Sequence, residues 1–512
     1  MSASKKKLQR REAVDVEKVN EAQAKQAAYK KKVRLYTIIG VVVAVLVVAL
    51  LIWNTGVFQK NATAATIGEE KLTVGEMSYY YYNNYYRYLY SYYGISDSDI
   101  FDSTTGKTYG DYYLELALSD AQSAVAFYNA AIAAGHTDAE VAENVEAQIA
   151  SMKSTAATNG YTYKAYLKAT MGEFMTPAIF KTRLTQQLLA ELYYSEISEA
   201  DYNSYTAADL EAYYTENTDQ IDTFNYSYLY FTPATVDTKD ADGNTLSDEK
   251  VAELKEAALA DAKAKAESAL ALYENGASIA DLIAKCEPST SADHIAVAGI
   301  SSISSLYSEK LLEMEIDEAA LVENSTSGYY VVVYHGRERN ENLTANVRHI
   351  LVRAETTTDA EGKVVAPTDE AWTAALTKAE SILAEYKAGT MNADAFAALA
   401  NKYSDDAGSN TTGGLYEDIA STGSYVPEFL DWIFDASGRQ AGDTGIVRHE
   451  GDTAGSNPYW GYHVMYLDNW GEAEWQLAAR SALSNASLNE WYENITKDYT
   501  AALSDGAKHI AG

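Results

Sequence analysis

The sequence holds a single cysteine, Cys286, and only six prolines in 512 residues. One cysteine excludes a disulfide within the chain. Because no cysteine follows the apolar segment near the N-terminus, a lipid-modified terminus is excluded too. Few prolines argue against proline-rich linkers and favour a helix-rich architecture. HExxH, GxSxG and P-loop motifs are missing, and His294, His335 and His449 show no metal spacing, so we expect no metal and no cofactor.

Positive charge is scarce outside the first 34 residues. Residues 1–34 carry eleven Lys or Arg and four acids, a net +7, which leaves −40 for the rest of a chain whose net charge is −33. An acidic body repels phosphate backbones, so we expect no nucleic-acid partner. The basic head 1–34 is expected to have another role, set by the segment that follows it.

Residues 35–59, LYTIIGVVVAVLVVALLIWNTGVFQ, contain no charged side chain. A helix of this length spans a hydrocarbon core of roughly 30 Å. The basic cluster before it places residues 1–34 in the cytoplasm by the positive-inside rule. A cleaved signal peptide is the rival interpretation, but the apolar core is long and no small-x-small cleavage site follows. We predict one transmembrane helix with the remaining chain outside the cytoplasm.

Residues 62–223 are dominated by helical patterns and are predicted to form an all-helical region after a short β-segment and turn. Ten of the fifteen residues from 79 to 93 are tyrosine. A tyrosine has a large apolar face and a polar tip, so this run is either a packed helix or an adaptable surface for unfolded chains. The two interpretations are compatible. The tail 472–512 is predicted to be an amphipathic helix that packs back onto this region.

The chain then repeats itself. Residues 224–340 and 341–471 each show a strand, a long helix, a short helix, a helical turn and a second strand. This order predicts two α+β domains with helices on a small antiparallel sheet.

The two repeats differ at two histidines. His349 aligns with Tyr228, and His463 aligns with Tyr330, while the flanking apolar positions keep their type. The fold therefore does not require histidine there, which argues against simple core residues. The loop of the second repeat also carries Asp406, which has no counterpart in the first.

Four segments of the second repeat follow one another in a recognisable order. They are VRHILV (347–352), FAALANKYSDD (396–406), VPEF (426–429) and WGYHVMYL (460–467), with a double glycine between the second and third. As a set they resemble the parvulin peptidyl-prolyl isomerases over residues 345–470. The whole layout resembles the membrane-anchored, extracytoplasmic foldases of the PrsA type and their periplasmic relative SurA.

This resemblance implies a site of known composition. His349 and His463 would be paired histidines, and Asp406 the polar residue near the twisting imide. Leu415 and Phe429 would hold the proline ring, together with Tyr425, which stands where the family usually has methionine. The family also usually has an aromatic residue after the double glycine, where Glu417 and Asp418 stand.

The expected protein is an extracytoplasmic peptidyl-prolyl cis/trans isomerase and foldase of the kind found on Gram-positive surfaces. Its partners would be unfolded or newly secreted polypeptides with Xaa–Pro segments, and the membrane through its N-terminal helix. The resemblance leaves a homodimer open. A non-catalytic holdase chaperone with two inactive parvulin domains is the alternative, and a structural surface protein such as an adhesin is a more distant one.

Overall fold

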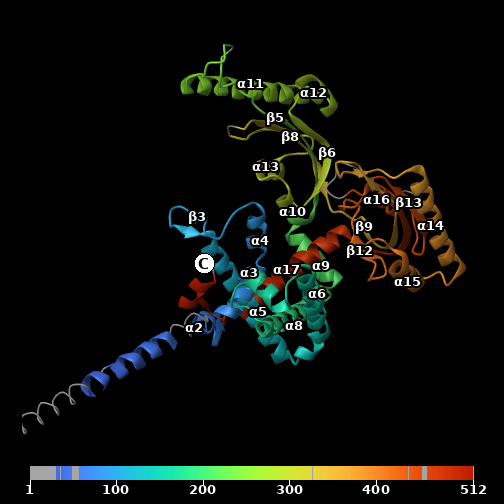
Figure 1. The fold of residues 1–512 in the computed structure, drawn as a ribbon. Coiled ribbons are helices and arrows are strands. Elements are labelled where there is room, and N and C mark those ends of the chain that lie inside the picture. Colours follow the sequence, from blue (N-terminus) through green and yellow to red (C-terminus); the bar gives the residue numbers. More distant parts are fainter. Residues whose placement is uncertain are drawn as a thin grey trace, which may run out of the picture. The chain divides into compact units, whose positions relative to one another are not determined.

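The computed structural model describes residues 30–34, 36–48, 57–240, 242–325, 327–435, 438–451 and 458–510. Figure 1 shows the helices and strands in their order along the chain. The chain divides into two compact units. The first contains the residues up to Asp201 and those from Ala486 onward, and the second runs from Tyr202 to Asn485. The boundary at 201/202 lies before the predicted one at 223/224, because α9 (Ala207–Glu216) and α10 (Thr218–Ile221) pack with the start of α17 (Glu474–Thr496) around Leu210 and Trp475.

The predicted transmembrane segment 35–59 lies partly outside the described residues. Residues 30–34 and 36–48 are helical, whereas residues 35 and 49–56 are not described. Within the part of the chain that the structure describes, no helix reaches the length and apolar character needed to cross a membrane.

Helices dominate the first unit as predicted, and the β-segment and turn predicted at its start belong to a small sheet whose extent was not predicted. A three-stranded antiparallel sheet runs in the order β15-β1-β2, formed by β1 (Thr63–Ile67), β2 (Glu70–Thr73) and β15 (Ala501–Leu503). The C-terminal strand β15 thus pairs with the first strand of the unit. A small hairpin, β3 (Ile100–Asp102) and β4 (Lys107–Thr108), was missed as well. Strands of two to five residues are too short to show a period in the sequence.

The tyrosine-rich run forms two helices with different surroundings. The first, α3 (Val74–Asn83), begins with a capping box between Thr73 and Glu76, and its tyrosines 79–81 are buried. Asn84 ends α3 and caps α4 (Tyr85–Tyr92), whose tyrosines are largely exposed. The helices that complete the unit are α5 (Tyr109–Ala134), α6 (Ala142–Thr158), α7 (Tyr163–Met171), α8 (Pro177–Tyr202) and the end of α17.

The second unit contains two four-stranded antiparallel sheets with the same strand order. The first is β6-β5-β8-β7 and the second is β12-β9-β14-β13. The strands of the first sheet are β5 (Thr223–Phe231), β6 (Thr290–Ala298), β7 (Ala319–Glu323) and β8 (Tyr329–Glu338). The strands of the second sheet are β9 (Leu343–Arg353), β12 (Leu415–Ile419), β13 (Thr444–His449) and β14 (Gly461–Ala473). Two strands of each sheet, β6 and β7 in one and β12 and β13 in the other, had not been predicted.

Matching helices accompany the two sheets. In the first repeat they are α11 (Asp248–Glu274), α12 (Ile279–Cys286) and α13 (Ser308–Glu313). In the second they are α14 (Asp369–Ala388), α15 (Ala393–Tyr403) and α16 (Pro427–Ile433). In the second repeat α14 and α15 cover one face of the sheet around Phe396, and α16 covers the other around Phe429. Each long central strand is therefore buried on both faces.

The register of the central strands agrees with the alignment of the repeats. His349 lies opposite Met465 in the second sheet, and Tyr228 lies opposite Val332 in the first. His463 and Tyr330 each stand two residues before these partners. The rings of His349 and His463 are 5.2 Å apart, and those of Tyr228 and Tyr330 are 6.0 Å apart. One backbone arrangement thus carries a histidine pair in one sheet and a tyrosine pair in the other.

Candidate functional site

The two histidines come from adjacent strands and point to the same face of the second sheet. His349 on β9 and His463 on β14 are 5% and 3% exposed. Their Nδ1 atoms are 3.0 Å apart, a hydrogen-bond distance. This pair lies on the face that α16 covers, and Phe429 packs edge-on against both rings. The sheet therefore holds the two imidazoles in one fixed arrangement.

Asp406 is brought to this pair by the loop after α15. Its Oδ2 atom lies 3.0 Å from His349 Nε2, and it also accepts from the hydroxyls of Ser409 at 2.5 Å and Tyr416 at 3.0 Å. Sequence reasoning found Asp406 but not Ser409 or Tyr416, which have no counterpart in the quoted motifs. The three predicted polar residues, His349, His463 and Asp406, thus lie in one hydrogen-bonded group.

The double glycine lets the loop pass close to the strand. Gly413 and Gly414 both have left-handed φ, +72° and +71°. The carbonyl of Gly414 accepts a hydrogen bond from the His349 amide at 2.9 Å, and a Cβ on Gly414 would stand 2.3 Å from the His349 carbonyl oxygen. Only glycine accepts this conformation at this distance.

The donors and acceptors fix the direction of the hydrogen bonds. A carboxylate only accepts, so His349 donates its Nε2–H to Asp406. A neutral His349 then accepts at Nδ1, and His463 must donate its Nδ1–H. This leaves His463 Nε2 as the acceptor for the hydroxyl of Tyr459, 3.3 Å away. The group is a chain of donors that runs from Tyr459 through His463 and His349 to Asp406.

Two pKa shifts agree with this assignment. The hydrogen bond from His349, with help from Ser409 and Tyr416, holds the pKa of Asp406 well below its usual range, although burial opposes this. Burial, together with the neighbouring imidazoles of His349 and His449, lowers the pKa of His463 to about 3. At neutral pH the site therefore contains one fixed negative charge and a neutral His463.

An aromatic group adjoins the polar chain. Tyr425, 36% exposed, stacks on Phe429 with ring centroids 5.6 Å apart, and it meets Tyr416 edge-on at 5.9 Å. Tyr416 in turn contacts the His349 ring at 5.3 Å. The predicted residues Tyr425 and Phe429 thus lie together beside His349. Flat apolar rings next to a fixed carboxylate can hold an apolar group against a polar wall.

The expectation that Leu415 belongs to this apolar group is wrong. In β12, Leu415 pairs with Arg348 and Tyr416 pairs with Val347. Since successive residues of a strand face opposite sides of the sheet, Tyr416 shares the face of His349 and Leu415 does not. An aromatic ring therefore does stand after the double glycine, one residue before Glu417, where the sequence comparison had not placed it.

The class of this domain follows from a comparison with known protein families. Residues 329–451 match the family described as the PPIC-type PPIASE domain, which confirms the resemblance to the parvulins. The match begins at β8 in the first sheet and ends before β14, so that it includes Asp406 and leaves out His463. No curated protein matches the chain.

Particular solved structures are similar to the chain. Peptidylprolyl isomerase PrsA from Bacillus cereus is 14% identical, with 79% of this chain and 91% of that chain covered and a TM-score of 0.18. Foldase protein PrsA from Streptococcus pneumoniae is 16% identical, with 46% and 76% covered and a TM-score of 0.19. A SurA-like chaperone from Campylobacter jejuni is 11% identical, with 54% and 82% covered and a TM-score of 0.14.

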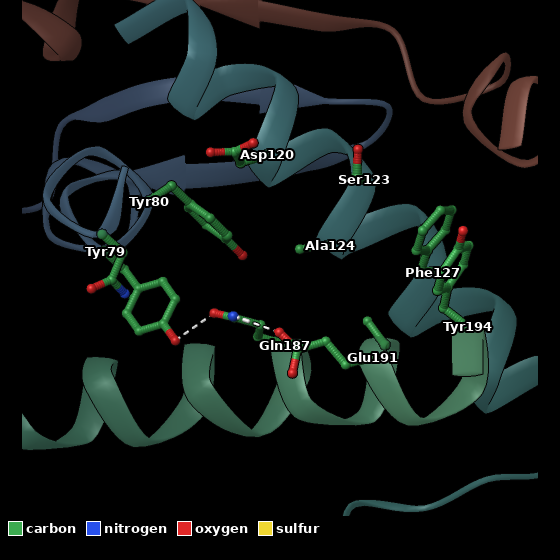
Figure 2. Close-up of a pocket in the computed structure, with 11 residues that line it drawn as sticks. Tyr79, Tyr80, Asp120, Ser123, Ala124, Phe127, Gln187, Glu191 and Tyr194 are labelled. Carbon is green, nitrogen blue, oxygen red and sulfur yellow. Dashed lines mark hydrogen bonds between the residues drawn. The ribbon is translucent and has the colours of Figure 1, made fainter. Parts of the chain in front are cut away.

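A second candidate site lies in the first unit. A cavity of about 340 Å³ opens between α3, α5 and α8, and Figure 2 shows the aromatic side chains that surround it. Tyr79 and Tyr80 stand at one end, and Phe127 and Tyr194 stack on each other at the other end. Burial raises the pKa of Asp120, which lines the same cavity. The cavity is mainly apolar with an acidic side, so it suits apolar segments that carry positive charge.

Proposed function

We propose that the chain is a peptidyl-prolyl cis/trans isomerase and foldase for newly secreted polypeptides, and that the second repeat is its catalytic part. The observation that carries this proposal is the contact between the hydrogen-bonded residues Tyr459, His463, His349 and Asp406 and the rings of Tyr416 and Phe429, on which Tyr425 packs. The family match over residues 329–451 supports it.

The chemistry needs no nucleophile. The Xaa–Pro bond rotates over a barrier of roughly 18–20 kcal/mol, and no bond is broken. A catalyst must favour the twisted imide, whose resonance is lost and whose carbonyl oxygen and nitrogen have changed charge. Here the aromatic rings would hold the proline ring, and the fixed charge of Asp406 with its ordered donors would stabilise the twisted state.

The test is the isomerisation of a short Xaa–Pro peptide by the full chain. Asp406→Asn removes the charge that orients His349, and we expect kcat/KM to fall by up to about 100-fold, because small misplacements cost this much. Asp405→Asn is the matched control. Its carboxylate accepts from the Arg353 amide at 2.9 Å, away from the histidines, so its rate should stay within about twofold. Equal rates for both variants would exclude Asp406 from the mechanism.

A holdase chaperone is the second candidate, and the cavity of the first unit favours it. Aromatic rings offer adaptable contacts to many apolar sequences, and the acidic body would attract basic clients. The two candidates are separable, because the cavity and the histidine site lie in different units. A chain that suppresses client aggregation and catalyses no Xaa–Pro isomerisation would be a holdase with a remnant site.

The N-terminal segment 35–59 supports a proposal about location. We infer that it anchors the protein in the cell membrane with residues 1–34 in the cytoplasm and the acidic body outside. Deletion of residues 1–59 should move the protein from the membrane fraction to the soluble fraction. Added protease should degrade the body in intact, wall-stripped cells, and protection of the body from protease would contradict this orientation.

A further inference from the structure

In the first sheet, the pairing of the central strand β5 with both of its neighbours, β6 and β8, is irregular. Opposite Ser227 on β5, the register of β6 passes from Ala292 to Ile295, so Asp293 and His294 together face one residue. On the other side of β5, the register of β8 passes from Tyr334 to Gly336, so His335 is an extra residue too. The first β-bulge lies opposite Ser227, and the second lies opposite the step from Asn225 to Tyr226, whereas Ser227 itself pairs with Val333. Bulges redirect side chains and are frequent beside functional sites.

The bulged residues turn toward one another. Ser227 Oγ lies 2.9 Å from Asp293 Oδ1 and 2.8 Å from His335 Nε2. His294 Nδ1 lies 2.6 Å from the same Asp293 oxygen. The rings of His294 and His335 stack at 4.0 Å and are nearly parallel. One ligand atom from each of Asp293, His294 and His335 lies within 4.8 Å of the others.

The hydrogen bonds leave lone pairs without a donor. The single Ser227 hydroxyl proton goes to the Asp293 carboxylate, so His335 must donate from Nε2. A neutral His335 then carries a lone pair on Nδ1, and the carboxylate of Asp317 lies only 3.6 Å from that atom. A proton on Nδ1 or a metal ion beside it would satisfy both of these acceptors.

The second sheet carries an ion pair at the positions that correspond to Ser227 and His335. Arg348 occupies the position of Ser227, and Asp468 occupies that of His335, by the same alignment that superposes His349 on Tyr228. Arg348 Nε and Asp468 Oδ2 form an ion pair at 3.0 Å. In the first sheet serine stands in the place of the arginine, and His335 stands in the place of the aspartate.

Backbone strain is concentrated here as well. His294 and Asp317 have left-handed φ values of +48° and +63°. For residues other than glycine such a conformation is strained, and it persists where other interactions stabilise it. The amide of His294 donates to Ser227 Oγ at 2.9 Å, which helps to hold the bulge.

We propose that Asp293, His294 and His335 bind a divalent transition-metal ion of the Zn²⁺ class, with the carboxylate of Asp317 beside His335. Two imidazoles and a carboxylate are a donor set that zinc accepts, and water would complete the coordination. Bound there, the ion would link the edge strand β6 to β8 across β5. His294 and His335 lie far apart along the chain and show no metal spacing in the sequence, and only the sheet register brings them together.

The test is a titration of the full chain, purified without a histidine tag, with Zn²⁺ and with Co²⁺ as a spectroscopic substitute. We expect one equivalent to bind, with a Co²⁺ visible band typical of nitrogen ligands. His294→Gln and His335→Gln should each weaken the affinity at least about tenfold, since even indirect changes at a metal site cost this much. His136→Gln is the matched control, because His136 pairs with Glu140 and Glu196 in the first unit.

Hydrogen exchange of the β6 amides gives a second readout, which separates lost binding from lost folding. Zn²⁺ should slow this exchange in the natural chain and in the His136 variant but not in the other two, whose metal-free exchange should equal that of the natural chain. Failure of the full chain to bind one equivalent would overturn the proposal. Equal affinity in all three variants would overturn it too.

Discussion

At the scale of single residues, the candidate site is defined by where its protons are. Asp406 accepts from three side chains, and its fixed charge sets the tautomer of His349 and, through it, that of His463. A substitution at any member of this chain is therefore felt at the others, so the effects of paired changes will not add. In the first sheet the equivalent residues, Tyr228 and Tyr330, contact each other through the edges and faces of their rings.

Protonation of His463 predicts a pH dependence of stability. Its pKa falls from 6.5 to about 3 on folding, so between these values the unfolded chain binds a proton that the folded chain excludes. Stability from this group is present above pH 6.5 and is lost as pH falls. Between pH 7 and 5 the loss should reach up to about 2 kcal/mol. The pKa of Asp406 is lowered as well, so this carboxyl group changes the stability only at more acidic pH, near and below its usual pKa of 3.8.

The measurement is the opening free energy of β14 amides, from hydrogen exchange at pH 7 and pH 5 with intrinsic rates corrected. His463→Gln keeps a polar side chain of similar size but does not titrate. Its opening free energy should be nearly the same at both pH values. An unchanged loss in this variant would assign the dependence to other groups.

Sequence reasoning reached His349, His463 and Asp406 because a second copy of the fold showed what the scaffold itself requires. It missed Ser409, Tyr416 and Tyr459, and it placed Leu415 on the wrong face. These residues depend on a strand register and a loop path that a one-residue shift reverses. Such a shift is invisible in a strand as short as β12.

At the scale of elements, the loop between α15 and β12 is what makes the second repeat different. Its close approach to β9 at Gly414 places Asp406 and Ser409 beside His349, and Tyr416 follows on β12. The double glycine indicated this loop in the sequence, whereas no pattern in the sequence indicated β12 and β13. Their burial does not alternate in a simple way, so the period that identifies a half-buried strand is absent.

Gly414→Ala tests this dependence on the loop. The substitution adds left-handed strain of about 1–2 kcal/mol and a Cβ that would meet the His349 carbonyl oxygen and the Ala400 side chain. Overpacking should cost about 1–3 kcal/mol more, and isomerisation should fall with it. Thermal unfolding and the peptide assay measure the two effects.

Gly442→Ala is the control with a matched backbone. Gly442 also has a left-handed φ, +93°, but a Cβ there meets nothing within 4 Å. It should show the strain alone, with near-normal isomerisation. If both variants lose the same stability and activity, the close approach at Gly414 is unimportant.

At the scale of the whole molecule, one sheet architecture occurs twice with different side chains. The first copy carries a tyrosine pair and a cluster of Asp and His residues, and the second carries the histidine chain and an Arg–Asp pair. The repeat itself could be predicted, because long helices and central strands keep their patterns. The places of strand β15 and of helices α9 and α10 could not, because these elements join segments that are remote in the sequence.

The cavity of the first unit predicts that holding clients and isomerising prolines are independent. Ala124 on α5 lines the cavity (Figure 2), and Ala124→Phe would fill part of its volume of about 340 Å³. We expect this variant to suppress the aggregation of an unfolded client several-fold less well, because apolar surface available to the client is lost. Its kcat/KM on a short Xaa–Pro peptide should be unchanged.

Ala133→Phe is the matched control. It adds the same ring to an exposed position of the same helix and should leave both activities intact. If Ala124→Phe suppresses aggregation as well as the natural chain does, clients are held elsewhere, and the exposed tyrosines of α4 become the surface to test.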